Sequence, residues 1–161
     1  MFKLEQNIVQ LLRKKGLSLG ITESATGGLI SHLITNVPGS SDVYKGSVTA
    51  YANSTKTNIL GVKAETLSQY GAVSSQVAEE MAMGGRRLLS VDICISDTGI
   101  AGPGGATPEK PVGLFYLGLA HGVAAYSHKH IFRGDREENK ERATHAALVY
   151  LKSYLLDLKL D

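Results

Sequence analysis

A serine and a lysine stand where apolar segments give way to segments typical of helices. Ser24 follows the short apolar run 17–21 and precedes Gly27 and Gly28, which open a predicted helix. A hydroxyl at such a strand-to-helix turn lies beside free backbone N–H groups, as a nucleophile with an oxyanion site would. A turn serine that hydrogen-bonds its own backbone explains the same spacing.

A nucleophilic serine needs a base, and the histidines offer poor candidates because of where they fall in the predicted elements. His32 and His145 fall within predicted helices, and His121 falls in a predicted hairpin turn. Lys56 instead begins a helix that follows a strand. A lysine serves as a base where burial or a neighbouring positive charge lowers its pKa. A solvated surface lysine is the alternative interpretation.

Two further segments have the composition of anion-binding sites. Residues 99–105 contain four glycines, which let backbone N–H groups approach an anion closely. The segment fits neither the Walker loop nor the dinucleotide fingerprint, and a mobile connection is the alternative. Arg136, after Gly134 and Asp135, opens the last predicted helix, where the dipole and a guanidinium suit a phosphate. A simple helix cap explains these residues equally well.

The remaining metal-ligating residue types favour structural roles. His128 and His130 alternate along a predicted edge strand, so both rings face one way and could share a metal. A charged edge strand that resists pairing between sheets is the commoner cause of such a run. Cys94 is the only cysteine and lies in the apolar run 91–95. We expect it to be buried, with no intramolecular disulfide and no cysteine-based zinc site.

Length and composition indicate one globular domain over residues 1–161. The chain is 43% hydrophobic and 20% charged, close to the globular average. Its net charge of +2 argues against a nucleic-acid surface. No stretch approaches the roughly 18 apolar residues that span a bilayer, and the N-terminus mixes charge into its apolar positions. We therefore expect a soluble, cytoplasmic protein without a membrane or nucleic-acid partner.

Hydrophobic patterning predicts the elements that position these residues. The expected strands cover 17–21, 44–51, 91–96, 112–120 and 124–132. The expected helices cover 4–15, 27–35, a short helix after Asn53, 63–69, 75–89 and 136–158. The short connection between the last two strands makes that pair antiparallel. This alternation predicts a three-layer α/β/α domain with a mixed, mostly parallel sheet of about five strands. Ligands of such sheets bind where strands end and helices begin.

Seven short segments occur together in an order typical of one known family. They are 22–28 (TESATGG), 38–41 (PGSS), 49–53 (TAYAN) with Lys56, 71–74 (GAVS), 98–105 (TGIAGPGG), 109–113 (EKPVG) and 134–136 (GDR). In this series the chain closely resembles the competence/damage-inducible CinA C-terminal domain family over nearly its whole length. The characterised activity of that family is nicotinamide mononucleotide deamidase. Longer members carry a further N-terminal domain, and at 161 residues we expect the stand-alone form.

The resemblance implies a serine amidohydrolase with a Ser/Lys pair and neither metal nor cofactor. The matching positions are Ser24 as nucleophile and Lys56 as base, with Tyr51 orienting Lys56 or the substrate. It also implies substrate contacts, with Arg136 and the glycine loop taking the 5′-phosphate and backbone N–H groups near Gly27 and Gly28, or in 102–105, holding the oxyanion. The expected substrate-binding residues are Thr26, Gly27, Gly28, Asn53, Gly99, Gly102, Gly104 and Arg136. A homodimer is expected by resemblance alone.

The chain departs from the family pattern at several positions. Ala25 replaces a cysteine that many members carry, and Asp97 replaces an often apolar residue, where it either tunes Lys56 or faces solvent. Further departures are at Leu114, Asn139 and Lys140. Two alternatives stay open: a non-catalytic nucleotide-binding or regulatory module, and an amidohydrolase of another small amide.

Overall fold

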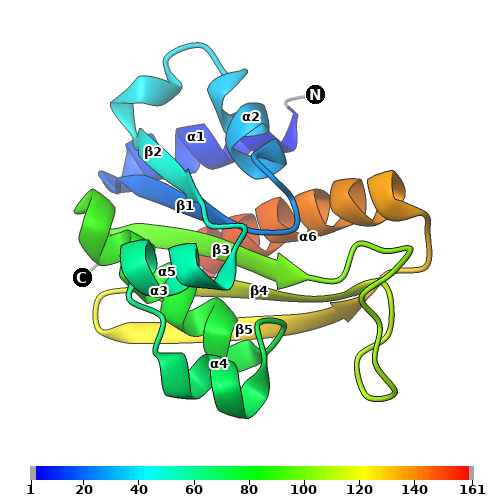
Figure 1. The fold of residues 1–161 in the computed structure, drawn as a ribbon. Helices are drawn as coiled ribbons and strands as arrows, with labels where there is room; N and C mark the ends of the chain where they lie inside the picture. The colour runs from blue at the N-terminus through cyan, green and yellow to red at the C-terminus, as the bar shows by residue number, and fades with distance from the viewer. Residues whose placement is uncertain (1–2, 160–161) are drawn as a thin grey trace.

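The chain alternates strands and helices before a final hairpin and long helix, and its strands form one sheet between two helical layers (Figure 1). The computed structural model describes residues 3–159. The strands are β1 (Leu19–Glu23), β2 (Tyr44–Thr49), β3 (Ile93–Gly99), β4 (Leu114–His121) and β5 (Ala124–Ile131). The helices are α1 (Leu4–Lys15), α2 (Leu29–Thr35), α3 (Asn53–Leu60), α4 (Ala64–Tyr70), α5 (Ser75–Leu89) and α6 (Arg136–Asp157), with a 3-10 turn at Ser40–Asp42.

The strands lie in the order β2-β1-β3-β4-β5. The pairs β1–β2 and β1–β3 are parallel, and β4 is antiparallel to both β3 and β5. Among the described strands, β4 is therefore the one that runs against the others. The predicted three-layer architecture with a mixed, mostly parallel sheet is confirmed. Because β1, β2 and β3 are parallel, their carboxyl ends meet at one edge of the sheet, where ligands of open α/β sheets bind.

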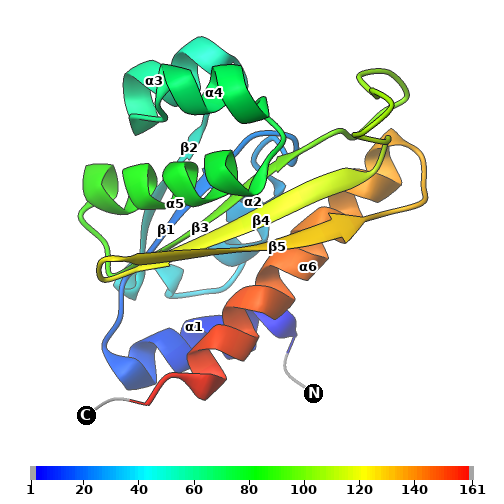
Figure 2. The same cartoon turned by 90° about the horizontal axis from the view of Figure 1, so that it is seen from below.

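Helices α1, α2 and α6 cover one face of the sheet, and α3, α4 and α5 cover the other (Figure 2). The larger core lies under the first group, where Ile21 and Ile95 of neighbouring strands share a cluster with Ile34 and Leu148. On the other face α5 packs on the sheet, and α3 and α4 pack on α5. Within residues 3–159, every helix is too short or too polar to cross a bilayer.

Two glycines bring α5 unusually close to its neighbours. A Cβ built on Gly84 would lie 1.8 Å from the Leu60 carbonyl oxygen at the end of α3, and one on Gly85 would lie 2.3 Å from the Thr22 Cγ2 of β1. The Gly84 contact sets the distance between α5 and α3, the helix that carries Lys56.

Strands β1 and β3 extend farther into polar sequence than hydrophobicity predicts. β1 ends at Glu23 instead of residue 21, and β3 ends at Gly99 instead of residue 96. The side chains of Glu23 and Asp97 in these extensions are 0% exposed, and hydrogen-bond donors surround both carboxyl groups. Such bonds offset the cost of burying polar groups. As a result, Ser24 directly follows the end of β1.

Helix α2 begins two residues later than predicted. Gly27 and Gly28 have φ values of 63° and 107° and form a turn, and the helix starts at Leu29. Glycine adopts this left-handed backbone without the steric cost of a Cβ. The turn leaves four residues between the end of β1 and Gly28, and these residues connect the strand to α2.

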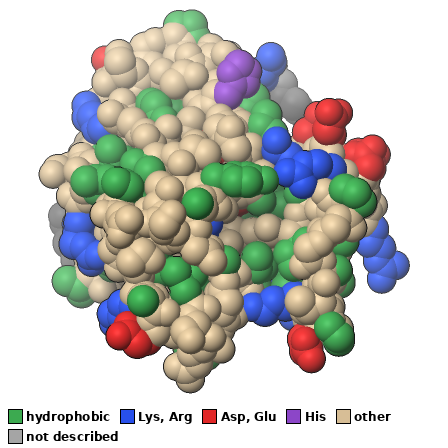
Figure 3. Space-filling model, viewed as in Figure 1, with side chains coloured by type: hydrophobic (Ala, Val, Ile, Leu, Met, Phe, Trp, Pro, Cys, Tyr) green, Lys and Arg blue, Asp and Glu red, His purple; other side chains and the backbone are tan. Residues whose placement is uncertain are grey.

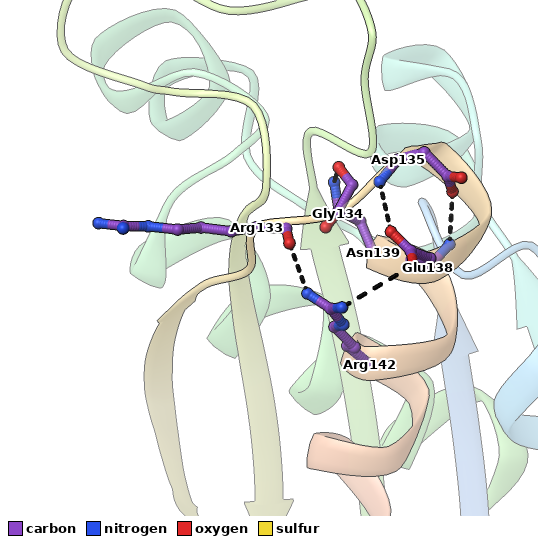
Figure 4. Close-up of polar contacts among 6 residues, drawn as sticks. All are labelled: Arg133, Gly134, Asp135, Glu138, Asn139 and Arg142. Atoms are coloured by element: carbon purple, nitrogen blue, oxygen red, sulfur yellow. Dashed lines mark hydrogen bonds and ion pairs between the residues drawn. The ribbon is translucent and has the colours of Figure 1, made fainter.

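The first turn of α6 is fixed by a capping box, shown in Figure 4. The Asp135 carboxylate accepts a hydrogen bond from the Glu138 N–H, and the Asp135 N–H donates to the Glu138 carboxylate, both at 2.9 Å. Arg142 donates to the carbonyl of Arg133 at 2.6 Å and so ties the preceding loop to the helix. The predicted cap is confirmed, and it holds Arg136 at the start of α6.

Candidate active site

Ser24 and Lys56 meet at the carboxyl edge of the parallel strands. Ser24 follows β1, and Lys56 lies in the first turn of α3, which follows β2. The Lys56 Nζ lies 3.0 Å from the Ser24 Oγ. It also donates to the carbonyls of Ala50 at 2.9 Å and Tyr51 at 3.2 Å. Lys56 is only 2% exposed, so its charged form loses most of its hydration.

Burial changes the acid–base behaviour of Lys56. Loss of solvation lowers the pKa of Lys56 below its usual 10.5, and the nearby Asp97 carboxylate opposes that shift. A lysine with a lowered pKa has a larger neutral fraction near neutral pH, and a neutral amine can accept a proton. The pair therefore has the geometry and the electrostatics of a nucleophile and its base. The surface-lysine alternative is wrong.

Asp97 holds the backbone around Ser24. Its carboxyl group accepts hydrogen bonds from the N–H groups of Ser24 at 2.9 Å and Thr26 at 3.2 Å. Burial raises the pKa of Asp97 to about 6, partly opposed by hydrogen bonds from Thr26 and Ser24. Of the two roles left open by the sequence, solvent exposure is wrong, and Asp97 lies where it affects Lys56.

Glu23 organises the start of α2 and was missed by the sequence analysis. Its carboxylate accepts from the N–H groups of Gly28, Ile30 and Ser31 and from the Ser31 hydroxyl. The Thr26 hydroxyl lies 2.6 Å from a Glu23 oxygen and 2.6 Å from an Asp97 oxygen. The available signal was an acidic residue between a buried strand and the glycines of a helix start, where a carboxylate binds free N–H groups.

A cavity of about 240 Å³ opens beside Ser24. Its lining includes Ser24, Tyr51, Asn53, Lys56, Gly99, Gly102, Gly104 and Arg136, all of which were predicted as site residues. Ala25, Ala72, Val73, Thr98, Ile100, Ala101 and Gly105 complete it. The structure thus brings together β1, the β2–α3 connection, the glycine loop and the start of α6. On the face shown in Figure 3, the Lys and Arg side chains are scattered among apolar and acidic groups.

Arg136 joins the two sides of this cavity. Its Nη1 donates to the Gly102 carbonyl at 2.7 Å, and its Nη2 donates to the Tyr51 hydroxyl at 3.0 Å. Asn139, one turn later on α6, donates to the carbonyls of Ala101 and Gly134. The glycine loop is therefore bound to α6 at two successive positions. The mobile-loop alternative for 99–105 is not supported by these contacts.

Three predicted substrate contacts lie outside the cavity lining. Thr26 is 0% exposed and faces two carboxyl groups. The N–H of Gly27 donates to the Ser24 carbonyl, and the N–H of Gly28 donates to Glu23. Neither N–H is free for an oxyanion. Within residues 3–159, no hydrogen bond uses the N–H groups of Ala25, Gly102 or Gly104, which all belong to cavity-lining residues.

The two histidines of β5 pack on aromatic rings. His128 stacks on Tyr150 with ring centroids 4.0 Å apart, and His130 stacks on Phe132 at 5.4 Å. No group of three or more His, Cys, Asp or Glu side chains in the described part of the chain is arranged to hold a metal. Cys94 is buried, as predicted.

Comparison with known proteins gives a family match and relatives that carry the same family name. The CinA C-terminal domain family matches residues 1–155. A CinA-like protein of Thermotoga maritima is 44% identical over 158 residues, covering 95% of this chain and 37% of that protein. A CinA-like protein of Kosmotoga olearia is 48% identical over 155 residues, covering 96% and 38%. The chain thus spans less than two fifths of the length of these curated relatives.

Solved structures share the fold. The crystal structure of competence/damage inducible protein CihA from Agrobacterium tumefaciens has a TM-score of 0.90 at 37% identity, covering 96% of this chain and 94% of that one. A competence damage-inducible protein A from Klebsiella pneumoniae has a TM-score of 0.94 at 29% identity, covering 97% of both chains. Since the family match extends over nearly the whole chain, this protein belongs to the CinA C-terminal domain family.

Proposed function

We propose that this chain is a nicotinamide mononucleotide deamidase, which hydrolyses the carboxamide of its substrate to nicotinate mononucleotide and ammonia. The observation that carries the proposal is the buried Lys56 Nζ, 3.0 Å from the Ser24 Oγ, at the wall of a cavity. A Ser/Lys pair of this kind suits attack on an amide carbon. The substrate itself comes from the family resemblance and from the anion-binding groups around the cavity.

The neutral form of Lys56 accounts for all three of its polar contacts. A neutral amine has two N–H donors and one lone pair. The two N–H groups suit the carbonyls of Ala50 and Tyr51, and the lone pair then faces the Ser24 hydroxyl. The Tyr51 contribution to Lys56 is therefore made by its backbone carbonyl, while its side chain reaches Arg136.

The reaction proceeds in two halves that use the same two groups. The Ser24 Oγ forms a bond to the carboxamide carbon while its proton passes to the Lys56 Nζ. The C–N bond then breaks, and Lys56 returns the proton to the departing nitrogen, which leaves as ammonia. In the second half water attacks the acyl-enzyme, Lys56 accepts a water proton, and Ser24 regains its hydrogen as nicotinate mononucleotide is released.

The oxyanion formed during attack requires N–H donors near the Ser24 Oγ. The N–H groups of Ala25, Gly102 and Gly104 are unused donors at the cavity among the described residues. The residue after a nucleophile supplies such a donor in other hydrolases, and losing one typically lowers the rate by roughly 10²–10³. This moves the oxyanion proposal away from Gly27 and Gly28.

The 5′-phosphate is assigned to Arg136 and the glycine loop. The guanidinium lies at the N-terminus of α6, where the helix dipole adds to its positive charge. Gly102 and Gly104 leave their N–H groups unblocked by side chains, and Asn53 offers an amide at the same cavity. Together these groups favour an anionic nucleotide over an uncharged amide.

The test is ammonia release from nicotinamide mononucleotide by purified, chelator-treated protein, with Ser24→Ala measured alongside. We expect turnover by the wild type and none by the variant. Turnover by neither, with the nucleotide still bound, would favour a non-catalytic nucleotide-binding module. A panel of small amides under the same conditions separates the proposed substrate from another amide.

A further inference from the structure

One hydroxyl group lies between two buried carboxyl groups. The Thr26 Oγ1 is 2.6 Å from an oxygen of Glu23 and 2.6 Å from an oxygen of Asp97. A threonine hydroxyl has one proton to donate, so it forms only one of these two short contacts as the donor. At the other contact, the Thr26 oxygen and the carboxylate oxygen would repel each other if no proton lay between them. A second proton must therefore lie on one of the two carboxyl groups.

The remaining hydrogen bonds identify which carboxyl group is protonated. Glu23 accepts three backbone N–H groups and the Ser31 hydroxyl in addition to its contact with Thr26, so its ionised form is strongly solvated by the protein. Apart from its own contact with the Thr26 hydroxyl, Asp97 accepts two hydrogen bonds within residues 3–159, from the N–H groups of Ser24 and Thr26. Donors stabilise the carboxylate, and the group with more of them keeps its charge. The Thr26 proton therefore goes to Glu23, and the Asp97 proton goes to Thr26.

We propose that Asp97 is a positioning residue that holds this proton in the resting protein and so keeps Lys56 in its neutral, proton-accepting form. An ionised Asp97 beside Lys56 would favour the ammonium instead. Asp97 and Lys56 thus compete for one proton, and the hydrogen bonds from Asp97 through Thr26 to Glu23 hold that proton on Asp97. The consequence for catalysis rests on the proposed function, whereas the location of the proton does not.

Burial acts in the same direction. It raises the pKa of Asp97 to about 6. With the Thr26 proton on Glu23, the Asp97 carboxylate loses the hydrogen bond from the Thr26 hydroxyl that stabilises its charged form. The neutral Asp97 in turn no longer opposes the lowering of the Lys56 pKa.

Charged groups on three elements lie near Asp97 or near the turn that follows Thr26. Glu23 on β1 raises its pKa, and Lys56 on α3 is the amine whose pKa an ionised Asp97 would raise. From α6, the Lys140 Nζ would lie 3.7 Å from a Cβ built on Gly27, at the next residue after Thr26.

The first test is a carbon-13 spectrum of protein labelled at the aspartate carboxyl carbon, recorded at neutral pH. The chain has six aspartates, and Asp97 is the buried one among those that the structure describes. We expect one carboxyl signal at the position of a protonated acid, and we expect Asp97→Asn to remove it. A wild-type spectrum in which all aspartates are ionised would overturn the proposal without any need for the variant.

The second test follows Lys56 itself, with lysine labelled at Cε and titrated in the wild type and in Asp97→Asn. Because Asp97 is already neutral, we expect the Lys56 titration to stay where it is. If Asp97 were an ionised partner, its removal would lower the Lys56 pKa by about one to three units, and that result would overturn the proposal. Lys56→Met identifies the signal. Neither readout needs turnover, so a failed deamidase assay leaves this inference separately testable.

Discussion

The Arg136 guanidinium lies 3.0 Å from the phenolic oxygen of Tyr51, a residue 85 positions earlier in the chain. The same side chain donates to the Gly102 carbonyl. One cation thus connects the β2–α3 connection, the glycine loop and α6 at the rim of the cavity. In the free protein its donors are satisfied by neutral oxygens, which a phosphate would replace with charged ones.

Arg136→Ala is expected to weaken binding of the phosphorylated substrate. Hydrogen bonds to charged groups contribute about 1.5–3 kcal/mol, so KM for nicotinamide mononucleotide should rise by roughly 10- to 100-fold with kcat little changed. The unphosphorylated nucleoside should be affected far less. Steady-state kinetics on both substrates provide the measurement, and Tyr51→Phe is the matched control because it removes only the contact with Tyr51. Equal losses on both substrates would refute the phosphate role.

Ser24→Ala is expected to lower kcat by at least about a thousandfold, because the nucleophile is removed. The fold should persist, since within residues 3–159 the Ser24 hydroxyl hydrogen-bonds to Lys56 alone, and its backbone N–H, which the variant keeps, donates to Asp97. Ammonia release and thermal unfolding are measured together. Ser54→Ala, an exposed serine on α3, is the control. Wild-type turnover by Ser24→Ala would rule out the nucleophile assignment.

Lys56 should make stability depend on pH in a defined direction. Its pKa is lowered in the folded protein, so between that value and the unfolded 10.5 the unfolded chain binds more protons. The free energy of unfolding therefore rises with pH through this window, by about 1.4 kcal/mol for each unit by which the pKa is lowered. Activity should rise with pH through the lowered pKa of Lys56, at the lower end of this window, because the neutral amine forms there.

Lys56→Met removes both effects. We expect no turnover and a flatter dependence of stability on pH than in the wild type, measured by denaturant unfolding at several pH values. If the two proteins show the same slope while Lys56→Met is inactive, Lys56 acts as a base without a lowered pKa.

Gly84→Ala is expected to disturb the site from a distance. The added Cβ would meet the Leu60 carbonyl at 1.8 Å, so α3 must move away from α5. Overpacking of this kind costs about 1–3 kcal/mol, and the displaced α3 carries Lys56. We expect a lower melting temperature together with reduced kcat. Leu88→Ala, at an exposed position of α5, is the control. A Gly84→Ala protein with unchanged stability would show that α3 is not held by this contact.

Much of the fold could be predicted because hydrophobic periodicity reports which segments are buried. The pairing of Ser24 with Lys56 is also accessible, since residues that follow adjacent parallel strands reach the same edge. The ends of β1 and β3 could not be predicted, because Glu23 and Asp97 are polar yet buried. Their burial depends on donors supplied by the folded chain, which hydrophobicity alone does not reveal.

The contacts across the cavity could not be predicted for a related reason. Arg136 meets Tyr51 and Gly102 only because of the path that two loops take after the sheet forms. Thr26 was predicted to touch the substrate from its place in the TESATGG segment. The structure instead gives its hydroxyl to two carboxyl groups that belong to different strands.

The sheet separates the cavity from the turn between β4 and β5. Gly99 pairs with Phe115 near the cavity, whereas Ile93 pairs with His121 at the opposite edge, just before a turn at Gly122 and Val123 (Figure 1). Val123 is fully exposed. A cysteine placed there would offer an attachment point for a dye or a solid support, with the cavity mouth directed away from the tether.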